Sequence, residues 1–318
     1  MTKTIPTLKM SNGVEMPVLG LGTWQSTDDS VRVAVEKAVG ECGYPLIDTA
    51  AVYANEQVIG DVLSKLFKAG KVHRDDVFIT TKLWTTHLNP ARAEAGIRDS
   101  LAKLQLERVD LLLAHMPTAF NENMSEQEKN VTVEEVWKGL ESIYEKGLAR
   151  AIGVSNWNVE QIERVLKIAR IPIHNVQVEL YLYFPQDELV AVCAKHGITL
   201  TSYGSLGSPG RVEFQLPTGQ KLDWAPAPNA LDDPVVKELA DKYKKTPAQI
   251  LLRFCLDRGV AVIPKSVNAD RLKQNIDVFD FKLAPSDLQA LLSRPHRQRL
   301  FLQDFMAGHP EDAFASER

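Results

Sequence analysis

Long apolar stretches are absent from this chain of 318 residues. No run approaches the roughly 20 apolar residues that a membrane-spanning helix requires, and residues 1–6 contain no apolar segment of the kind that directs secretion. We therefore expect a cytoplasmic protein that has no membrane partner.

The sequence also lacks any concentration of charge of one sign. Lys and Arg together number 37, Asp and Glu number 41, and the formal net charge is −4. Nucleic acids and anionic membranes are bound by clustered positive charge, so neither is expected as a partner.

Cysteine is scarce. The chain has three, Cys42, Cys193 and Cys255, and they are widely spaced without a CxxC motif. This pattern is typical of reduced, structural thiols in a cytoplasmic protein. The seven histidines do not pair at a helical ligand spacing, so we expect no metal site and give little weight to a metal-dependent hydrolase.

Short apolar segments, in contrast, are plentiful and alternate with amphipathic helical patterns from about residue 18 onward. Many are β-branched, as is typical of strands that are buried on both faces. The predicted strands cover residues 18–21, 46–49, 77–83, 109–114, 149–154, 176–179, 198–203 and 260–263. Between them lie helical repeats, some with a clear start, such as Asn89-Pro90 and Thr246-Pro247.

Strands that alternate with helices pair in parallel, because every return connection is a crossover. Both an open doubly wound sheet and a closed barrel satisfy that order. An open dinucleotide-binding sheet has G-x-G-x-x-G after its first strand, whereas residues 20–25 read GLGTWQ and lack the third glycine. We therefore predict an α/β fold of the (β/α)8 TIM-barrel type.

Two parts of the chain lie outside the strand–helix repeat. An N-terminal β-hairpin is predicted over about residues 7–17, because Asn12-Gly13 is a strong turn signal, and we expect it to close the barrel floor. The barrel itself would span about residues 18–280, followed by a C-terminal helix and tail over about residues 284–318. We expect residues 1–318 to form one domain.

Polar residues follow nearly every predicted strand. Barrel enzymes place their active sites at the C-terminal ends of the strands, so these positions are candidates for chemistry. They are Asp48 with Tyr53, Lys82 with Trp84, His115, Ser155-Asn156, Gln177, Tyr203 and Lys265-Ser266.

Each of these residues has a simpler interpretation when it is taken alone. An Asp after a strand is commonly a turn residue, a Tyr commonly packs, and a Lys can extend to solvent. Their convergence on one barrel mouth instead favours a proton-transfer site. There Asp48 would keep Lys82 protonated, Lys82 would lower the pKa of Tyr53, and His115 could orient a carbonyl oxygen.

Five motifs, in order and at similar spacing, resemble those of the aldo-keto reductases. They are Asp48-Thr49-Ala50-x-x-Tyr53 with Asn55-Glu56, Thr81-Lys82-Leu83-Trp84, Asp110-Leu-Leu-Leu-x-His115, Gly153-Val-Ser-Asn156 and Ile263-Pro-Lys-Ser266. The resemblance extends from Gly13 to about Leu292. The opening segment from Met16 to Trp24 is similar to the aldose/aldehyde reductase branch.

The resemblance implies transfer of a hydride from NADPH to a carbonyl carbon, with Tyr53 as general acid in reduction. Asp48, Lys82 and His115 would complete a catalytic tetrad. The family also makes a monomer the expected state.

The resemblance further implies which residues contact NADPH. Ser155, Asn156 and Gln177 would hold the carboxamide, while Lys265 and Arg271 match basic contacts to the 2′-phosphate and favour NADPH over NADH. The full set is Thr23, Trp24, Ser155, Asn156, Gln177, Tyr203, Leu206, Ser208, Lys265, Ser266, Asn268, Arg271, Gln274 and Asn275. Tyr203 would stack on the nicotinamide, and Gln274 and Asn275 would contact adenine.

Aromatic and apolar residues near the mouth would form the substrate pocket, namely Trp24, Trp84, Met116, Phe120 and Phe214. Such a wall with two polar anchors suits aldehydes and ketones that carry a hydrophobic body.

The chain also departs from the family pattern. Met116 stands where the family commonly has Trp, Gly204-Ser205 replaces Ser-Pro, and the tail from Arg294 has little family pattern. The resemblance still implies that this C-terminal tail lines the substrate pocket. The long loop over residues 206–231 is interpreted as a cover over the cofactor. These departures leave the identity of the carbonyl substrate open.

The sequence also allows a protein that is not primarily an enzyme. A regulatory or structural barrel protein could bind the cofactor and turn over little substrate, as some members of the superfamily do. The complete tetrad argues against this alternative.

Overall fold

The computed structural model describes residues 5–215 and 221–318. In this part of the chain, an eight-stranded parallel sheet has the order β10-β9-β8-β7-β6-β5-β4-β3. The strands are β3 (Leu21–Gly22), β4 (Leu46–Asp48), β5 (Phe78–Leu83), β6 (Val109–Ala114), β7 (Ala149–Ser155), β8 (Asn175–Glu179), β9 (Thr199–Tyr203) and β10 (Val260–Val262). The predicted strands all form, and most of their bounds shift by one or two residues.

The two ends of the sheet meet. Leu19 forms a parallel bridge with Val262, and Gly22 forms another with Lys265. The amide of Gly20 also donates to the carbonyl oxygen of Val262 at 2.9 Å. The sheet is therefore closed, which confirms the predicted barrel. The amide of Val262 also donates to the carbonyl oxygen of Val18 at 2.8 Å, so the predicted first strand, residues 18–21, takes part in the closure although β3 itself begins at Leu21.

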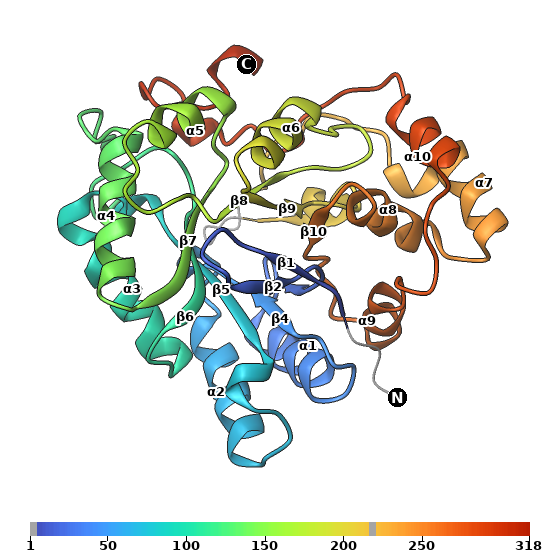
Figure 1. The fold of residues 1–318 in the computed structure, drawn as a ribbon, viewed down its shortest axis with the longest axis horizontal. Helices are drawn as coiled ribbons and strands as arrows, with labels where there is room; N and C mark the ends of the chain where they lie inside the picture. Colours follow the sequence, from blue (N-terminus) through green and yellow to red (C-terminus); the bar gives the residue numbers. More distant parts are fainter. Residues whose placement is uncertain (1–4, 216–220) are drawn as a thin grey trace.

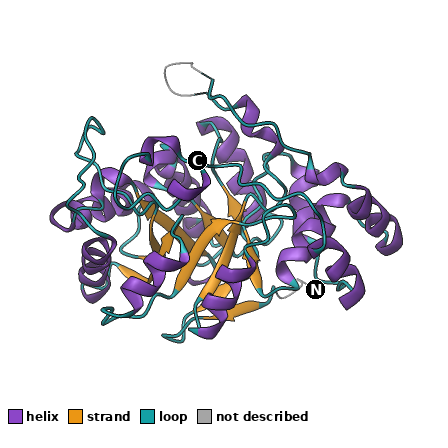
Figure 2. Cartoon of the chain, turned by 90° about the horizontal axis from the view of Figure 1, so that it is seen from above, coloured by secondary structure: helices purple, strands orange, loops and turns teal. Residues whose placement is uncertain are grey.

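Helices follow the strands and cover the outside of the barrel (Figures 1 and 2). They are α1 (Asp28–Gly40), α2 (Glu56–Lys68), α3 (Pro90–Leu104), α4 (Val133–Glu145), α5 (Val159–Leu166), α6 (Asp187–Lys195), α7 (Pro234–Tyr243), α8 (Pro247–Leu256), α9 (Ala269–Ile276) and α10 (Pro285–Leu292). None of the helices that the structure describes is both long enough and apolar enough to cross a membrane.

Alternation along the strands separates two layers of the core. In β6, Leu111 and Leu113 pack with inward residues of other strands, whereas Leu112 packs in the larger outer layer against the helices. Side chains alternate between faces along a strand, so one short apolar segment supplies both layers. This explains why the strands read as continuous apolar runs.

The N-terminal hairpin forms as predicted. Strands β1 (Thr7–Lys9) and β2 (Glu15–Pro17) pair antiparallel, and Gly13 turns with a φ of 85°. Met10 and Met16 are buried against the inward layer of the barrel, so the hairpin closes its floor. The mouth at the other end stays available for chemistry.

Local start signals account for several helices. The side chain of Asn89 accepts from the amide of Ala91 at 3.1 Å, and that of Thr246 accepts from Gln249 at 3.3 Å. Asn55 precedes α2 but does not cap it, because its amide instead donates to the carbonyl oxygen of Thr23 at 3.0 Å. That side chain ties the β3 and β4 ends together.

The C-terminal tail after α10 returns across the barrel toward α5 and α6 (red in Figure 1). Residues 216–220, inside the loop predicted as a cover, lie outside the described residues. The single domain over residues 1–318 stays a prediction.

Candidate active site

The four residues of the predicted tetrad come from three neighbouring strands. Asp48 is the last residue of β4, and Tyr53 ends a short 3-10 helix, Ala51–Tyr53, that directly follows. Lys82 lies in β5, and His115 directly follows β6. The parallel order of these strands brings all four side chains to one end of the barrel.

Lys82 is the centre of this group. Its ammonium donates to Asp48 Oδ1 at 2.5 Å, to the carbonyl oxygen of Thr49 at 2.9 Å and to Tyr53 Oη at 3.3 Å. The Lys82 side chain is 1% exposed, so its charge needs these three partners. Gln177 donates to the second oxygen of Asp48 at 2.8 Å and holds that carboxylate in place.

The pKa of Tyr53 departs from its ordinary value in the direction opposite to our expectation. Burial raises it well above the usual phenol value, and the charge of Asp48 raises it further. Burial likewise lowers the pKa of Lys82, against the opposing effect of Asp48. Asp48 largely compensates the charge of Lys82, so the pair does little to acidify the phenol. Tyr53 therefore keeps its proton at neutral pH.

His115 is neutral in this setting. Burial lowers its pKa well below the ordinary value, and the nearby charge of Lys82 acts in the same direction. Its ring meets those of Tyr53 and Trp84 edge to face, with centroids 5.6 and 5.2 Å away. Within the described residues, the buried Nδ1 of His115 has no hydrogen-bond partner. A neutral imidazole beside Tyr53 is suited to hydrogen bonding rather than to carrying charge.

Asn156, after β7, connects His115 with the next part of the mouth. Its Nδ2 donates to the carbonyl oxygen of His115 at 2.9 Å and to Ser155 Oγ at 3.2 Å. Its Oδ1 accepts from the hydroxyl of Tyr203 at 2.6 Å. The backbone at Asn156 has a φ of 62°, a left-handed conformation that aims the amide at these partners.

The observed hydrogen bonds show which of the three residues expected to bind the carboxamide still have an unused donor or acceptor. Asn156 already uses both ends of its amide within the protein, so Ser155 and Gln177 are the better candidates. The hydroxyl proton of Ser155 and the Oε1 of Gln177 have no acceptor or donor among the described residues. One donor and one acceptor are the pair that a carboxamide needs.

The expected phosphate site contains two cations that are free of carboxylates. Lys265 follows β10 and Arg271 lies in the first turn of α9, and both are exposed. Within residues 5–215 and 221–318 neither forms an ion pair. Unpaired cations beside a helix N-terminus fit a phosphate group, which offers charged oxygens to both.

Some polar atoms near these two cations are already hydrogen-bonded within the protein, and others are unused. Asn268 caps α9, accepting from the amides of Asp270 and Arg271 at 3.0 Å each. The hydroxyl of Ser266 accepts from the amide of Asn268 at 3.1 Å. The hydroxyl of Ser266 also donates to the carbonyl oxygen of Asn268 at 3.3 Å. Among the described residues the Nδ2 of Asn268 has no acceptor, and the side chains of Gln274 and Asn275 make no hydrogen bond. The structure thus brings these expected adenosine contacts together on α9 and the loop that precedes it.

Four further expected cofactor contacts follow the strands β3 and β9. The hydroxyl of Thr23 donates to the carbonyl oxygen of Asp48 at 2.9 Å, which places Thr23 directly behind the tetrad. Trp24 follows it, partly buried. Leu206 and Ser208 lie in the loop after β9, also partly buried, and Ser208 has a φ of 43°.

The predicted pocket residues fall into two aromatic groups. Trp24 packs on Phe214 with ring centroids 5.4 Å apart, and Trp84 lies beside His115. Phe120 and Met116 are both buried, and Met116 packs with residues of the tail. Both groups lie near the tetrad, since Trp84 contacts His115 and Trp24 directly follows Thr23, whose hydroxyl donates to the carbonyl oxygen of Asp48.

The tail supplies pocket residues that we did not predict. Phe301 meets Trp24 at 5.5 Å, and Phe305 meets Trp84 at 5.5 Å and Phe120 at 6.0 Å between ring centroids. Met306 packs with Met116. The resemblance implied that the tail lines the pocket, but the tail sequence gave no signal for which of its residues would pack against the expected pocket residues.

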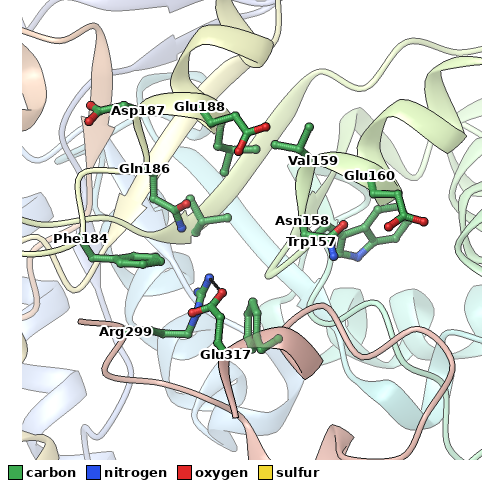
Figure 3. Close-up of a pocket in the computed structure, with 13 residues that line it drawn as sticks. Trp157, Asn158, Val159, Glu160, Phe184, Gln186, Asp187, Glu188, Arg299 and Glu317 are labelled. Atoms are coloured by element: carbon green, nitrogen blue, oxygen red, sulfur yellow. Dashed lines mark hydrogen bonds and ion pairs between the residues drawn. The ribbon is translucent and has the colours of Figure 1, made fainter. Parts of the chain in front are cut away.

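A separate hollow of about 320 Å³ lies between α5, α6 and the tail (Figure 3). It is lined by residues such as Trp157, Glu160, Glu188 and Arg299, and none of the predicted site residues belongs to it. No group of three His, Cys, Asp or Glu side chains suited to a metal ion occurs in the described part of the chain.

The fold and the site together define a (β/α)8 barrel with an Asp–Tyr–Lys–His group at its strand ends. The model of the Aldo/keto reductase family matches residues 18–293. The chain is 41% identical over 307 residues to aldo-keto reductase family 1 member A1-A of Danio rerio, covering 93% of this chain and 91% of that protein. It is 40% identical over 294 residues to member A1 of Homo sapiens, covering 89% and 87%.

Solved structures agree. An aldose reductase from Schistosoma japonicum has a TM-score of 0.87 and 35% identity, covering 99% of this chain and 100% of that one. A Bombyx mori aldo-keto reductase in complex with NADP has the same TM-score and identity, covering 98% and 99%. The chain belongs to the aldo/keto reductase family, which confirms the resemblance read from its motifs.

Proposed function

We propose that this protein reduces aldehydes and ketones to alcohols with NADPH, using Tyr53 as the general acid. The single observation that supports this most is the position of Tyr53, whose hydroxyl accepts a hydrogen bond from the ammonium of Lys82 at 3.3 Å. Family membership and the NADP complex of the Bombyx mori relative support the same reaction and cofactor.

Tyr53 holds the proton that the product alcohol needs. Its raised pKa keeps the phenol protonated at neutral pH, which is the state required of an acid. As the proton leaves Oη, negative charge develops there, and the ammonium of Lys82 stabilises it. Asp48 holds that ammonium in position from the opposite side.

His115 would orient the substrate. Its neutral ring lies edge to face with Tyr53, so a carbonyl oxygen near Tyr53 Oη is also within reach of the imidazole. A neutral donor fixes the carbonyl without competing with Tyr53 for the role of acid.

When bound, NADPH supplies the hydride. We propose that Ser155 and Gln177 hold its carboxamide, because each has an unused hydrogen-bonding function. Lys265 and Arg271 would hold the 2′-phosphate, since each is a cation without a carboxylate partner among the described residues. Tyr203, fixed by Asn156, would limit the movement of the nicotinamide ring.

The substrate class follows from the walls of the mouth. Trp24 and Phe214 on one side and Trp84 and Phe120 on the other are apolar, and Tyr53 and His115 are the polar anchors between them. We propose carbonyl compounds with an aromatic or otherwise hydrophobic body. We also propose that the protein acts as a monomer in the cytoplasm, as its thiols and its family suggested.

The decisive experiment mixes the purified protein with NADPH and a reactive aromatic aldehyde and follows the loss of NADPH absorbance. We expect steady oxidation that depends on both the aldehyde and the protein. Tight NADPH binding without oxidation above background would instead favour a regulatory or structural barrel protein.

A further inference from the structure

Glu179, the last residue of β8, is a buried carboxylate that the proposed mechanism does not use. Its exposed fraction is 0%. Its two oxygens accept hydrogen bonds from backbone amides of the C-terminal tail, Leu300 at 2.6 Å and Phe301 at 3.0 Å. The two bonds join residues that are more than a hundred positions apart in the sequence. Glu179 therefore fastens the tail to the end of a barrel strand.

The second residue fastened in this way, Phe301, contacts the mouth of the barrel. Its ring meets Trp24, Tyr203 and Trp224 edge to face, with centroids 5.5, 5.7 and 5.4 Å away. Trp24 is one of the predicted pocket residues, and Tyr203 is fixed to Asn156. The position of Phe301 thus determines how far the Trp24 wall can move.

Close packing beneath Phe301 leaves it little freedom. A Cβ atom added to Gly204 would lie 3.8 Å from the Phe301 ring, so the glycine backbone is already near the phenyl edge. Phe301 itself is 6% exposed. The backbone amides of Leu300 and Phe301 are fixed at this point by their hydrogen bonds to the two oxygens of Glu179.

Arg299, which directly precedes Leu300, also holds the tail in place. The guanidinium of Arg299 lies over the rings of Phe184 and Phe314, at 4.5 and 3.8 Å from their centroids, and pairs with Glu317 at 2.7 Å (Figure 3). Burial raises the pKa of Glu179 to about 7, and the positive charge of Arg299 acts in the opposite direction. The carboxyl is thus kept in an unfavourable environment, which is typical of a group retained for a specific contact.

We propose that Glu179 is a positioning residue that sets the Trp24 side of the substrate pocket by holding Phe301 in place, and thereby determines which carbonyl substrates bind well. The proposal rests on the proposed function for its kinetic consequence, although the latch between Glu179 and the tail can be tested without turnover. Glu179 pairs with Tyr203, an expected cofactor contact, in the sheet. Burial raises the pKa of Tyr203, and the charge of Glu179 raises it further. The carboxylate oxygens of Glu179 instead hold the tail through Leu300 and Phe301, which is the route to the Trp24 side of the pocket.

A second side chain, that of Gln127, also binds the C-terminal tail and serves as a matched comparison. The side-chain amide of Gln127 donates to the carbonyl oxygens of Phe305 and Ala307 at 3.2 and 3.0 Å. It holds the part of the tail that packs on Trp84, which is not among the residues that the Phe301 ring contacts. Gln127→Ala is therefore a control that loosens the tail elsewhere and leaves the Phe301 contact intact.

The first test measures amide hydrogen exchange in the protein without substrate. In Glu179→Gln the side chain keeps its size, but its NH₂ group faces a backbone amide, so one of the two hydrogen bonds is lost. We expect exchange at Leu300 and Phe301 to become faster by about tenfold. Gln127→Ala should accelerate exchange near residues 305–307 and leave residues 300–301 unchanged.

The second test measures steady-state kinetics at saturating NADPH with two aldehydes, a bulky aromatic one and propanal. For Glu179→Gln we expect KM for the aromatic aldehyde to rise about tenfold, which corresponds to 1.4 kcal/mol, with kcat within about twofold. KM for propanal should change little, because a small substrate reaches only Tyr53 and His115.

Phe301→Leu provides an independent variant that leaves Glu179 intact. It should reproduce the same difference between the two aldehydes, because it removes the ring that Glu179 holds. Unchanged amide exchange in Glu179→Gln, or equal changes of KM for both aldehydes in both variants, would overturn the proposal. If the wild-type protein oxidised no NADPH, the proposed function would fail while the exchange measurement would still decide the latch.

Discussion

The ammonium of Lys82 donates a hydrogen bond to the hydroxyl oxygen of Tyr53 at 3.3 Å. The same ammonium is paired with Asp48, so the charge beside the phenol is partly compensated. This arrangement leaves Tyr53 protonated in the resting site and stabilises negative charge on Oη only as the proton departs. It is the property that a general acid requires for a reaction at neutral pH.

Removal of the Tyr53 hydroxyl should abolish most of the reduction. For Tyr53→Phe we expect kcat to fall by about 10²- to 10⁴-fold, because a positioned acid contributes on that order. NADPH affinity should change little, since the hydroxyl contacts Lys82 rather than the expected cofactor residues. NADPH oxidation and a fluorescence titration measure the two effects, and turnover close to wild type would refute the assignment.

The pH dependence of the reduction should follow the raised pKa of Tyr53. The protonated phenol is the active form, so kcat/KM should stay level through neutral pH and decline only above pH about 10. Since the pKa of His115 is lowered well below 6.5, protonation of its ring should cause no loss near that pH. Alcohol oxidation needs the phenolate and should therefore become faster as pH rises.

Asp48→Asn tests how much the charge of Asp48 contributes to the raised pKa of Tyr53. Loss of the Asp48 charge should lower the pKa of Tyr53, so the decline of the reduction should begin at a lower pH than in the wild type. The variant also leaves Lys82 without its buried partner, which costs stability, and the profile is to be recorded below its melting temperature. A pH profile identical to that of the wild type would contradict the role given to Asp48.

Arg271→Ala should distinguish the two nicotinamide cofactors. We expect the Kd for NADPH to rise roughly tenfold, as for the loss of one partly exposed charge-assisted hydrogen bond. The Kd for NADH, which lacks the 2′-phosphate, should change little. Lys273→Ala, which removes a charge on the same helix, is the control. Equal weakening of both cofactors by Arg271→Ala would speak against the phosphate contact.

The barrel wall provides a prediction about stability. A Cβ atom on Gly153 in β7 would lie 2.1 Å from the carbonyl oxygen of Asn175 in the neighbouring strand. Gly153→Ala should destabilise the fold by about 1–3 kcal/mol, because neither backbone can move without opening the sheet. Gly210→Ala, where nothing lies within 4 Å, should leave the melting temperature nearly unchanged. Thermal unfolding of the two variants measures this difference.

Much of the site was predictable because its residues are carried at strand ends. The period of apolar residues identified the strands, and the barrel fold then placed Asp48, Lys82 and His115 at one end without further information. The family and fold predictions are confirmed. The roles of the individual site residues stay predictions.

Other features were not predictable from local patterns. The sequence suggested that Lys82 lowers the pKa of Tyr53, whereas burial and Asp48 raise it in the structure. Asn55 resembled a helix cap, yet its amide binds the backbone of Thr23. In both cases the outcome depends on which groups share a buried space, and sequence spacing does not give that information.

The sequence by itself determined the order of strands and helices, the closing hairpin and the polar residues at the mouth, because these follow from local periodicity and turn chemistry. The tertiary structure decided the charge balance around Tyr53 and the position of the tail. Glu179 meets Leu300 and Phe301 across more than a hundred residues, through hydrogen bonds to backbone amides that leave no signature in the tail sequence. Such contacts arise only when the folded chain brings distant segments together.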